Sequence, residues 1–170
     1  MDRLYSPWRL SYVTTASEAV AGCIFCNAVA ADESDPLVVA RGRSAFVILN
    51  LYPYNSGHLM IVPNRHIASL ADLSAEERAE VMDLTARAEV AVTEVYRPQG
   101  LNIGVNLGKA AGAGIADHLH VHVVPRWTGD TNFMSVVGNV RVLPEEVPAS
   151  VERLRPVFER IAMERRNVGT

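Results

Sequence analysis

Residues 117–127 read DHLHVHVVPRW, and they combine a structural pattern with an unusual composition. His118, His120 and His122 stand at every second position, with apolar residues between them. Because successive side chains of a β-strand point to opposite faces of a sheet, this alternation predicts a strand with three imidazoles on one face. We expect the opposite, apolar face to pack on a helix.

Four further segments carry strand signals, because β-branched and aromatic residues are frequent in them. The region 53–57, which is rich in Pro, Asn, Ser and Gly, predicts a turn between the second and the third of these strands. The four segments cover residues 37–41, 44–50, 58–63 and 101–107.

Helices are predicted between and after the strands. Ser74 followed by Glu77 is a capping-box pattern, and apolar residues then recur at helical spacing until Pro98. A second helical stretch covers about 149–166, where Pro156 is expected to kink or divide the helix. A meander of strands with helices between and after it predicts an antiparallel α+β domain.

Length and charge limit the range of functions. The chain has 170 residues, of which 49% are hydrophobic, so it is long enough for one compact domain and too short to suggest two. The 16 Lys and Arg residues and 19 Asp and Glu residues give a net charge of -3, so we expect no nucleic-acid partner. No apolar run approaches the roughly 20 residues of a membrane helix, and no signal-peptide pattern opens the chain. We therefore expect a cytoplasmic protein without a membrane partner.

Aligned histidines allow three interpretations. They can be solvated side chains on an open sheet face, ligands of a shared metal ion, or a nucleophile with neighbours that fix its tautomer and deliver a proton. The loop 108–114 contains three glycines and Lys109, and such a loop lets backbone N–H groups approach phosphate oxygens. Together the loop and the histidines favour phosphoryl or nucleotidyl transfer.

The two cysteines of the chain, Cys23 and Cys26, form a Cys-x-x-Cys pair. This spacing alone is typical of half a zinc site, of a redox pair or of two buried thiols. A structural disulfide is the least favoured interpretation in a reducing compartment.

Two motifs resemble those of the histidine triad (HIT) family of nucleotide hydrolases and transferases. HLHVHVV contains its alternating histidines, and GHLMIVPNRHI matches its Gly-His strand that runs into a second histidine. LYSPWRLSYV near the start and RWTGDTNF after the triad resemble a prokaryotic branch that includes diadenosine tetraphosphate phosphorylases. The resemblance covers the whole chain as one domain, with an arm at 1–22, a catalytic core at 23–127 and an extension at 128–170. It implies a five-stranded antiparallel sheet with two main helices, and a homodimer with a continuous sheet.

The same resemblance implies a role for each site residue. His120 would attack the α-phosphorus of a small-molecule nucleotide and form a covalent nucleotidyl-histidine, as a neutral imidazole can without prior deprotonation. His122 would contact the phosphate and assist proton delivery, and His58 would support the arrangement. Asn50 and Leu51 would bind the nucleoside. Asn106 and the glycine loop, with Gly112 and Gly114, would bind the phosphates.

Departures from the family pattern keep other functions open. Many members have Gln and Ser where this chain has Gly114 and Ile115, so two side-chain donors to the phosphate are missing. Asn50 stands where the phosphoramidase branch has Asp, which favours diadenosine polyphosphates as substrates over nucleoside phosphoramidates. The alternatives are a phosphoramidate hydrolase, a catalytically weak nucleotide-binding module, and an enzyme that depends on a metal at His120 or His122.

For the cysteine pair, the resemblance implies structural zinc and no organic cofactor. Members with this pair complete four ligands with a histidine after the Gly-His strand and with the first histidine of the triad. In this chain those positions are His66 and His118, so the expected ligands are Cys23, Cys26, His66 and His118.

Overall fold

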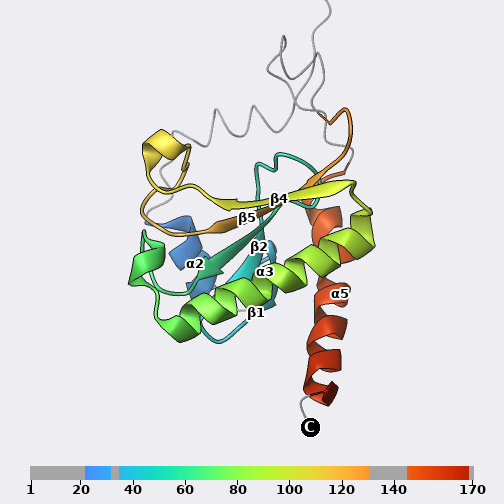
Figure 1. Cartoon of the computed structure of the whole chain (residues 1–170), viewed down its shortest axis with the longest axis horizontal. Coiled ribbons are helices and arrows are strands. Elements are labelled where there is room, and N and C mark those ends of the chain that lie inside the picture. Colours follow the sequence, from blue (N-terminus) through green and yellow to red (C-terminus); the bar gives the residue numbers. More distant parts are fainter. Residues whose placement is uncertain (1–21, 32–34, 131–144, 169–170) are drawn as a thin grey trace, which may run out of the picture.

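A computed structural model describes residues 22–31, 35–130 and 145–168 of the chain. The expected arm therefore lies almost wholly outside the described residues. Strands in the described part form one antiparallel sheet with the order β1-β2-β3-β5-β4 (Figure 1). Their bounds are Val38–Arg41 for β1, Ala45–Leu49 for β2, Leu59–Pro63 for β3, Gly100–Val105 for β4 and Val121–Arg126 for β5. The expected α+β class with a five-stranded antiparallel sheet is confirmed.

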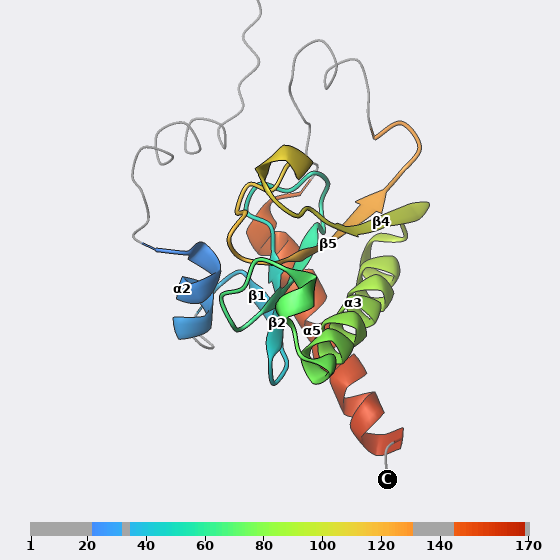
Figure 2. The same cartoon turned by 60° about the vertical axis from the view of Figure 1, so that its left-hand side comes forward.

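Two long helices cover one face of this sheet, and a short helix covers part of the other (Figures 1 and 2). The long ones are α3, Ala75–Tyr96, and α5, Val147–Val168. The short one is α2, Ile24–Ala30, and 3-10 turns occur at Leu70–Asp72 and Lys109–Ala111. Within the described ranges, no helix is long and apolar enough to span a bilayer.

Alternation along β2 builds a core on each face of the sheet. Val47 and Leu49 belong to the large core under α3 and α5, whereas Phe46 and Ile48 belong to a smaller core with Phe25 of α2. All five residues of β2 are buried, as expected for a strand that is covered on both faces. Among the described residues, α2 packs on β1, β2 and β3 and does not extend over the same face of β4 and β5.

Strand order corrects the expected meander. The first three strands follow one another as neighbours, but the chain then crosses through α3 to β4 at the sheet edge. It returns as β5, which pairs with both β3 and β4, so β5 is an interior strand. The residue pattern of a segment indicates whether it forms a strand. The order in which strands pair depends instead on how the long α3 crossover packs on the sheet.

The start of α3 follows its sequence signal, whereas the predicted division of the last helix at Pro156 is wrong. The Ser74 side chain accepts from the Glu77 N–H, and the Glu77 carboxylate accepts from the Ser74 N–H, so the capping box is confirmed. In contrast, α5 runs without division through Pro156. The buried side chains of Leu154 and Phe158 on either side hold this helix against the core, and such packing offsets the backbone hydrogen bond that proline removes.

The histidine stretch enters the sheet later than expected. Ladder pairing of β5 begins at Val121, and just before it Leu119 N–H donates instead to the carbonyl of Ile67 at 2.6 Å. The predicted alternation nevertheless continues through this irregular part, because Leu119 and Val121 lie in the core under the long helices. On the other face, the rings of His118 and His120 pack against Phe25.

Candidate active site and metal centre

The structure brings His58, His120 and His122 together on the face of the sheet that carries α2. His122 lies opposite Met60 in the β3–β5 ladder, and His58 comes directly before β3 on the same face as Met60. His58 Nε2 lies 3.0 Å from His122 Nδ1, and the centroids of the His120 and His122 rings are 4.8 Å apart. The three predicted catalytic histidines therefore form one connected cluster.

Backbone contacts fix the tautomers of two of these rings. The N–H of Tyr54 donates to His58 Nδ1 at 3.1 Å, so a neutral His58 carries its proton on Nε2. That N–H then donates to His122 Nδ1, which leaves the proton of a neutral His122 on Nε2. The ring of Tyr54 also stacks on His58, with centroids 4.9 Å apart.

His120 has the geometry of a neutral nucleophile. Its Nδ1 lies 2.9 Å from the carbonyl oxygen of His118 and donates to it, so the lone pair is on Nε2. Only 5% of the residue is exposed, and Phe25 and His122 pack against the ring. A packed ring with one nitrogen bound to the backbone is held in a single orientation, as a nucleophile requires.

Burial controls the charge of His122. Loss of hydration lowers its pKa to about 4, with a smaller contribution from neighbouring His120. The imidazole is therefore neutral at pH 7, and it can donate a hydrogen bond from Nε2 without bringing a positive charge.

The predicted nucleotide-binding residues fall in two places. Asn50 lies beside the histidines, because its Nδ2 is 3.3 Å from His58 Nδ1, and Leu51 next to it is exposed. In the second place, Gly112 lies close to the Asn106 amide and has φ of 90°, a conformation that other residues adopt at a cost. No heavy atom comes within 4 Å of a Cβ built on Gly114, so that part of the loop is open.

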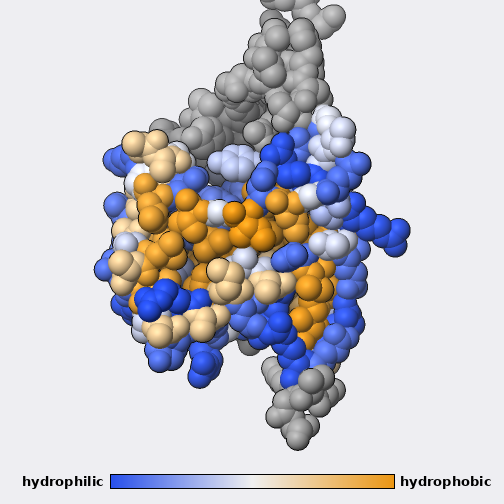
Figure 3. Space-filling model, viewed as in Figure 1, coloured by the Kyte–Doolittle hydropathy of each residue, from blue (hydrophilic) through white to orange (hydrophobic). Residues whose placement is uncertain are grey.

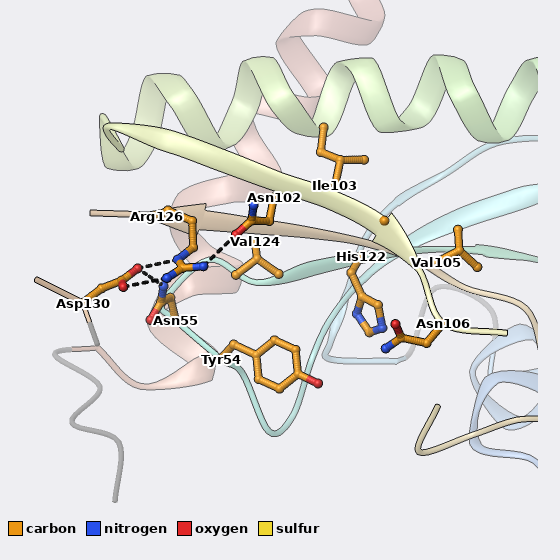
Figure 4. A pocket seen from close by; sticks show the side chains of 11 residues that line it. Tyr54, Asn55, Asn102, Ile103, Val105, Asn106, His122, Val124, Arg126 and Asp130 are labelled. Atoms are coloured by element: carbon orange, nitrogen blue, oxygen red, sulfur yellow. Dashed lines mark hydrogen bonds and ion pairs between the residues drawn. The ribbon is translucent and has the colours of Figure 1, made fainter. Parts of the chain in front are cut away.

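A pocket of about 400 Å³ opens beside His122, on the face of β4 and β5 over which α2 does not extend (Figure 4). Of the predicted site residues, His122 and Asn106 line it, whereas His58, His120 and Asn50 do not. Its further lining consists of Tyr54, Asn55, Asn102, Ile103, Gly104, Val105, Val124, Arg126 and Asp130.

Sequence analysis did not identify the polar group at the far end of this pocket. Arg126 donates from Nε and Nη2 to both carboxylate oxygens of Asp130, at 2.6 and 2.8 Å. Its Nη1 donates to Asn102 Oδ1 at 2.7 Å, and Asn55 donates to Asp130 at 2.9 Å (Figure 4). Strand alternation could have placed Asn102 and Asn106 on one face, but no sequence signal pairs Arg126 with Asp130.

Cys23, Cys26, His66 and His118 converge at the start of α2, where they are positioned to bind a metal ion. One ligand atom from each lies within 4.8 Å of all the others. The Cys23 sulfur is 3.3 Å from His118 Nδ1, and the Cys26 sulfur is 3.3 Å from His66 Nδ1. A tetrahedral zinc site with bonds of about 2.0–2.3 Å has ligand atoms about 3.3–3.8 Å apart, so the donor set and its spacing fit zinc.

His118 is oriented for metal binding by its second nitrogen. Nε2 lies 2.9 Å from the carbonyl oxygen of Pro63 and donates to it, which leaves the Nδ1 lone pair directed at the cysteines. Burial lowers the pKa of His118, so the ring is neutral, as a metal ligand must be. Since the carbonyl of His118 also accepts from His120, this residue connects the metal centre with the candidate nucleophile.

Comparison with known proteins agrees with this geometry. Residues 31–129 match the family model of the HIT domain. The AP-4-A phosphorylase of Mycobacterium tuberculosis is 44% identical over 152 residues, which cover 85% of this chain and 78% of that protein. A bis(5'-adenosyl)-triphosphatase of Dictyostelium discoideum is 30% identical over 122 residues, covering 68% of this chain and 80% of that protein.

A solved structure extends the agreement to three dimensions. The Zn-bound histidine triad family protein of Mycobacterium smegmatis superimposes with a TM-score of 0.68 and 29% identity, covering 84% of this chain and 97% of the other. On the matched model, the relatives and the shared fold, the chain belongs to the HIT family.

Proposed function

We propose that the protein is a nucleotidyl hydrolase or transferase that cleaves diadenosine polyphosphates through a covalent nucleotidyl-His120. The observation that carries this proposal is the 2.9 Å hydrogen bond from His120 Nδ1 to the backbone carbonyl of His118, which leaves the lone pair of the neutral ring on Nε2. The names of two relatives, AP-4-A phosphorylase and bis(5'-adenosyl)-triphosphatase, support this substrate class.

In the first step, His120 Nε2 attacks the α-phosphorus. A P–N bond forms, the bond from phosphorus to the bridging oxygen breaks, and the leaving nucleotide departs with that electron pair. The imidazole becomes positively charged, and the His118 carbonyl stabilises it through the hydrogen bond to Nδ1–H. In the second step, an oxygen of phosphate or water attacks phosphorus, and the P–N bond breaks with its electron pair returning to Nε2, so neutral His120 is released. When water attacks, its proton is lost to solvent.

His122 and His58 support this reaction by hydrogen bonding. The Tyr54 backbone orients His58, His58 orients His122, and the Nε2–H of His122 donates to a phosphate oxygen. A neutral imidazole is a poor acid, so this arrangement favours a leaving group that needs no proton. A terminal phosphate with a pKa near 6 leaves as an anion at pH 7, whereas the amine of a phosphoramidate must be protonated. The site therefore favours diadenosine polyphosphates over phosphoramidates.

Product analysis with diadenosine tetraphosphate tests the proposal. Incubation with inorganic phosphate is expected to give ADP and ATP if phosphate accepts the nucleotidyl group. AMP and ATP without phosphate would identify water as the acceptor. His120→Ala is expected to abolish turnover and to prevent an adenylyl group from appearing on the triad peptide in mass spectrometry after quenching at alkaline pH, which preserves the P–N bond.

Two results would contradict this function. Undiminished turnover by His120→Ala would show that another group is the nucleophile. Tight nucleotide binding by the wild-type protein without any product would favour a binding module, the alternative suggested by the absence of side-chain donors at Gly114 and Ile115.

The metal centre, we further propose, holds a structural zinc ion that ties the start of α2 to the triad. A closed set of two sulfur and two nitrogen ligands leaves no position for substrate, so the ion would supply stability and no step of the reaction. The purified protein is expected to contain one zinc per chain, and Cys26→Ser is expected to lower both the zinc content and the melting temperature. Wild-type zinc content and stability in that variant would refute the assignment.

We also propose a homodimer that pairs through β4. This strand is at the sheet edge, and Ile103 of β4 and Met82 and Val90 of α3 are exposed apolar side chains. Figure 3 shows apolar side chains gathered on the face where Figure 1 places α3 and β4. Unpaired edge strands and exposed apolar patches are typical of interfaces. Light scattering is expected to give twice the chain mass, and Ile103→Lys is expected to give the single mass.

A further inference from the structure

The pocket beside His122 extends well beyond the reacting centre. His122, Val124 and Arg126 occupy alternate positions on one face of β5 and all line it (Figure 4). His122 and Arg126 are four positions apart on an extended strand, a span of about 13 Å. Asn50 and Leu51, which the family resemblance assigns to the nucleoside that stays on His120, are not part of the lining. The pocket therefore provides room for a different part of the substrate.

Charge and shape show which part of a nucleotide would suit the far end. The charge of Arg126 is compensated by its two hydrogen bonds to Asp130, so this end offers no net positive charge for a phosphate. The same bonds hold the flat guanidinium in place, and a fixed guanidinium can stack on an aromatic ring. Asn102, bound to Arg126, adds an amide that can donate to a polar edge, and Val124 adds apolar surface.

We propose that this end of the pocket, formed by Arg126, Asn102 and Val124, binds the nucleoside of the leaving half of a two-headed nucleotide. The phosphates would run from His122 and Asn106 toward it, and the base would lie on the guanidinium. This inference rests on the proposed function and deepens it, because it explains how the site would distinguish a dinucleoside polyphosphate from a nucleotide with a small leaving group.

The test compares two substrates that share the half transferred to His120. One is diadenosine tetraphosphate, and the other is the p-nitrophenyl ester of AMP, whose leaving group lacks a nucleoside. Arg126→Met and Asn102→Ala are each expected to lower kcat/KM for the first substrate about tenfold, mainly through KM, because the first variant loses the stacking contact and the second a hydrogen bond to the base. For the ester, kcat/KM is expected to stay within about twofold of the wild-type value, because that substrate does not reach the far end.

Arg160→Met is the matched control. Arg160 also pairs with carboxylates, those of Glu94 and Glu164, and its side chain is 45% exposed against 42% for Arg126, but it lies on α5 and outside the pocket lining. This variant is expected to leave both substrates unaffected. Comparing two substrates on each variant also separates a binding role from a folding defect, because misfolding would lower activity on both.

Several outcomes would overturn the inference. Equal losses on both substrates would show that Arg126 and Asn102 act only on the structure, and no loss on either would show that the pocket end does not bind substrate. In both cases nucleotidyl transfer through His120 would stand. If the wild-type protein cleaves the ester but not diadenosine tetraphosphate, the two-headed substrate class is wrong. If it cleaves neither, the proposed function itself fails, and this inference with it.

Discussion

At the scale of single residues, His122 shows how burial sets a chemical role. The strand pattern placed it beside His120, but only the packed site gives it a pKa of about 4 and a fixed proton on Nε2. It is therefore neutral in the free protein at pH 7, and under the proposed mechanism the leaving group would have to carry its own charge. The burial of His122 would in this way influence which substrates the protein cleaves.

The lowered pKa of His122 predicts how stability depends on pH. An unfolded histidine titrates near 6.5, so between pH 6.5 and 4 the unfolded chain binds a proton that the folded chain does not. The free energy of unfolding should therefore decrease as pH falls through this range, by up to about 3 kcal/mol from this group. Urea denaturation at pH 7, 6, 5 and 4 measures the effect.

His122→Asn is the control, because it retains the metal ligands and removes this titration. The variant should lose less stability than the wild-type protein between pH 6.5 and 4. Parallel curves for the two proteins would show that His122 does not contribute to the acid dependence.

The backbone conformation of Gly57, next to His58, predicts that a larger residue there would destabilise the protein. The φ of Gly57 is +80°, and a Cβ built there would lie 2.5 Å from the ring of Tyr96. Gly57→Ala should therefore lower the free energy of unfolding by at least about 1–2 kcal/mol from backbone strain alone. Gly100→Ala is the control, because no atom lies within 4 Å of its Cβ position and its φ is not positive. Equal stability of the two variants in denaturant would contradict this account.

At the scale of elements, α3 is specified mostly by local signals. The hydroxyl of Ser74 and the carboxylate of Glu77 satisfy N–H groups in the first turn, and Arg97 ends the helix in a left-handed conformation. The pairing of α3 with the sheet follows from the buried residues of one side, including Leu84, Ala88 and Val92. Local capping and one apolar side thus determine where this helix lies.

Loss of the cap should have a measurable cost. Ser74→Ala is expected to lower the free energy of unfolding by about 1 kcal/mol, because it leaves the Glu77 N–H without its side-chain acceptor. Ser74→Thr keeps a hydroxyl at the same place and should retain most of the stability. If the alanine variant is as stable as the threonine variant in urea, the capping box does not stabilise the protein.

At the scale of the whole molecule, α5 is part of the core and not an appendage. Val151, Leu154, Phe158 and Ile161 join the core that β2, β3 and α3 form. Arg155 donates to the carbonyl of Val38 at 2.8 Å, and Arg153 lies over the ring of Tyr96. Because Tyr96 also contacts Gly57, α5 supports the turn that precedes His58. The part of the expected extension that forms α5 therefore packs in the core and against the Tyr96 ring beside this turn.

Truncation of one buried side chain in α5 should be costly. Leu154 is fully buried, so Leu154→Ala is expected to lower the free energy of unfolding by about 2–5 kcal/mol through lost packing and the cavity that remains. Met163 lies on the same helix but is 63% exposed, and Met163→Ala should change stability by less than about 0.5 kcal/mol. Similar losses in calorimetry for the two variants would show that α5 does not belong to the cooperative core.

The strands, the two long helices and the alignment of the histidines on one face could be predicted without a structure. Alternation of His118, His120 and His122 with apolar residues depends only on the two-residue period of an extended chain, so it was readable without a structure. The same holds for the capping box of α3. The Cys-x-x-Cys pair allowed three interpretations, and only the family resemblance joined it to His66 and His118, which the structure brings together.

Tertiary structure decided what depends on contacts between distant segments. No local signal predicts the interior position of β5, the passage of α5 through Pro156 or the pairing of Arg126 with Asp130 at the pocket end. Strand order follows from how α3 packs, and a proline is tolerated because Leu154 and Phe158 are buried on either side of it. A pKa likewise depends on the water that packing removes. Local periodicity therefore determined which residues could react, and packing decided their charge, their proton and the room for the substrate.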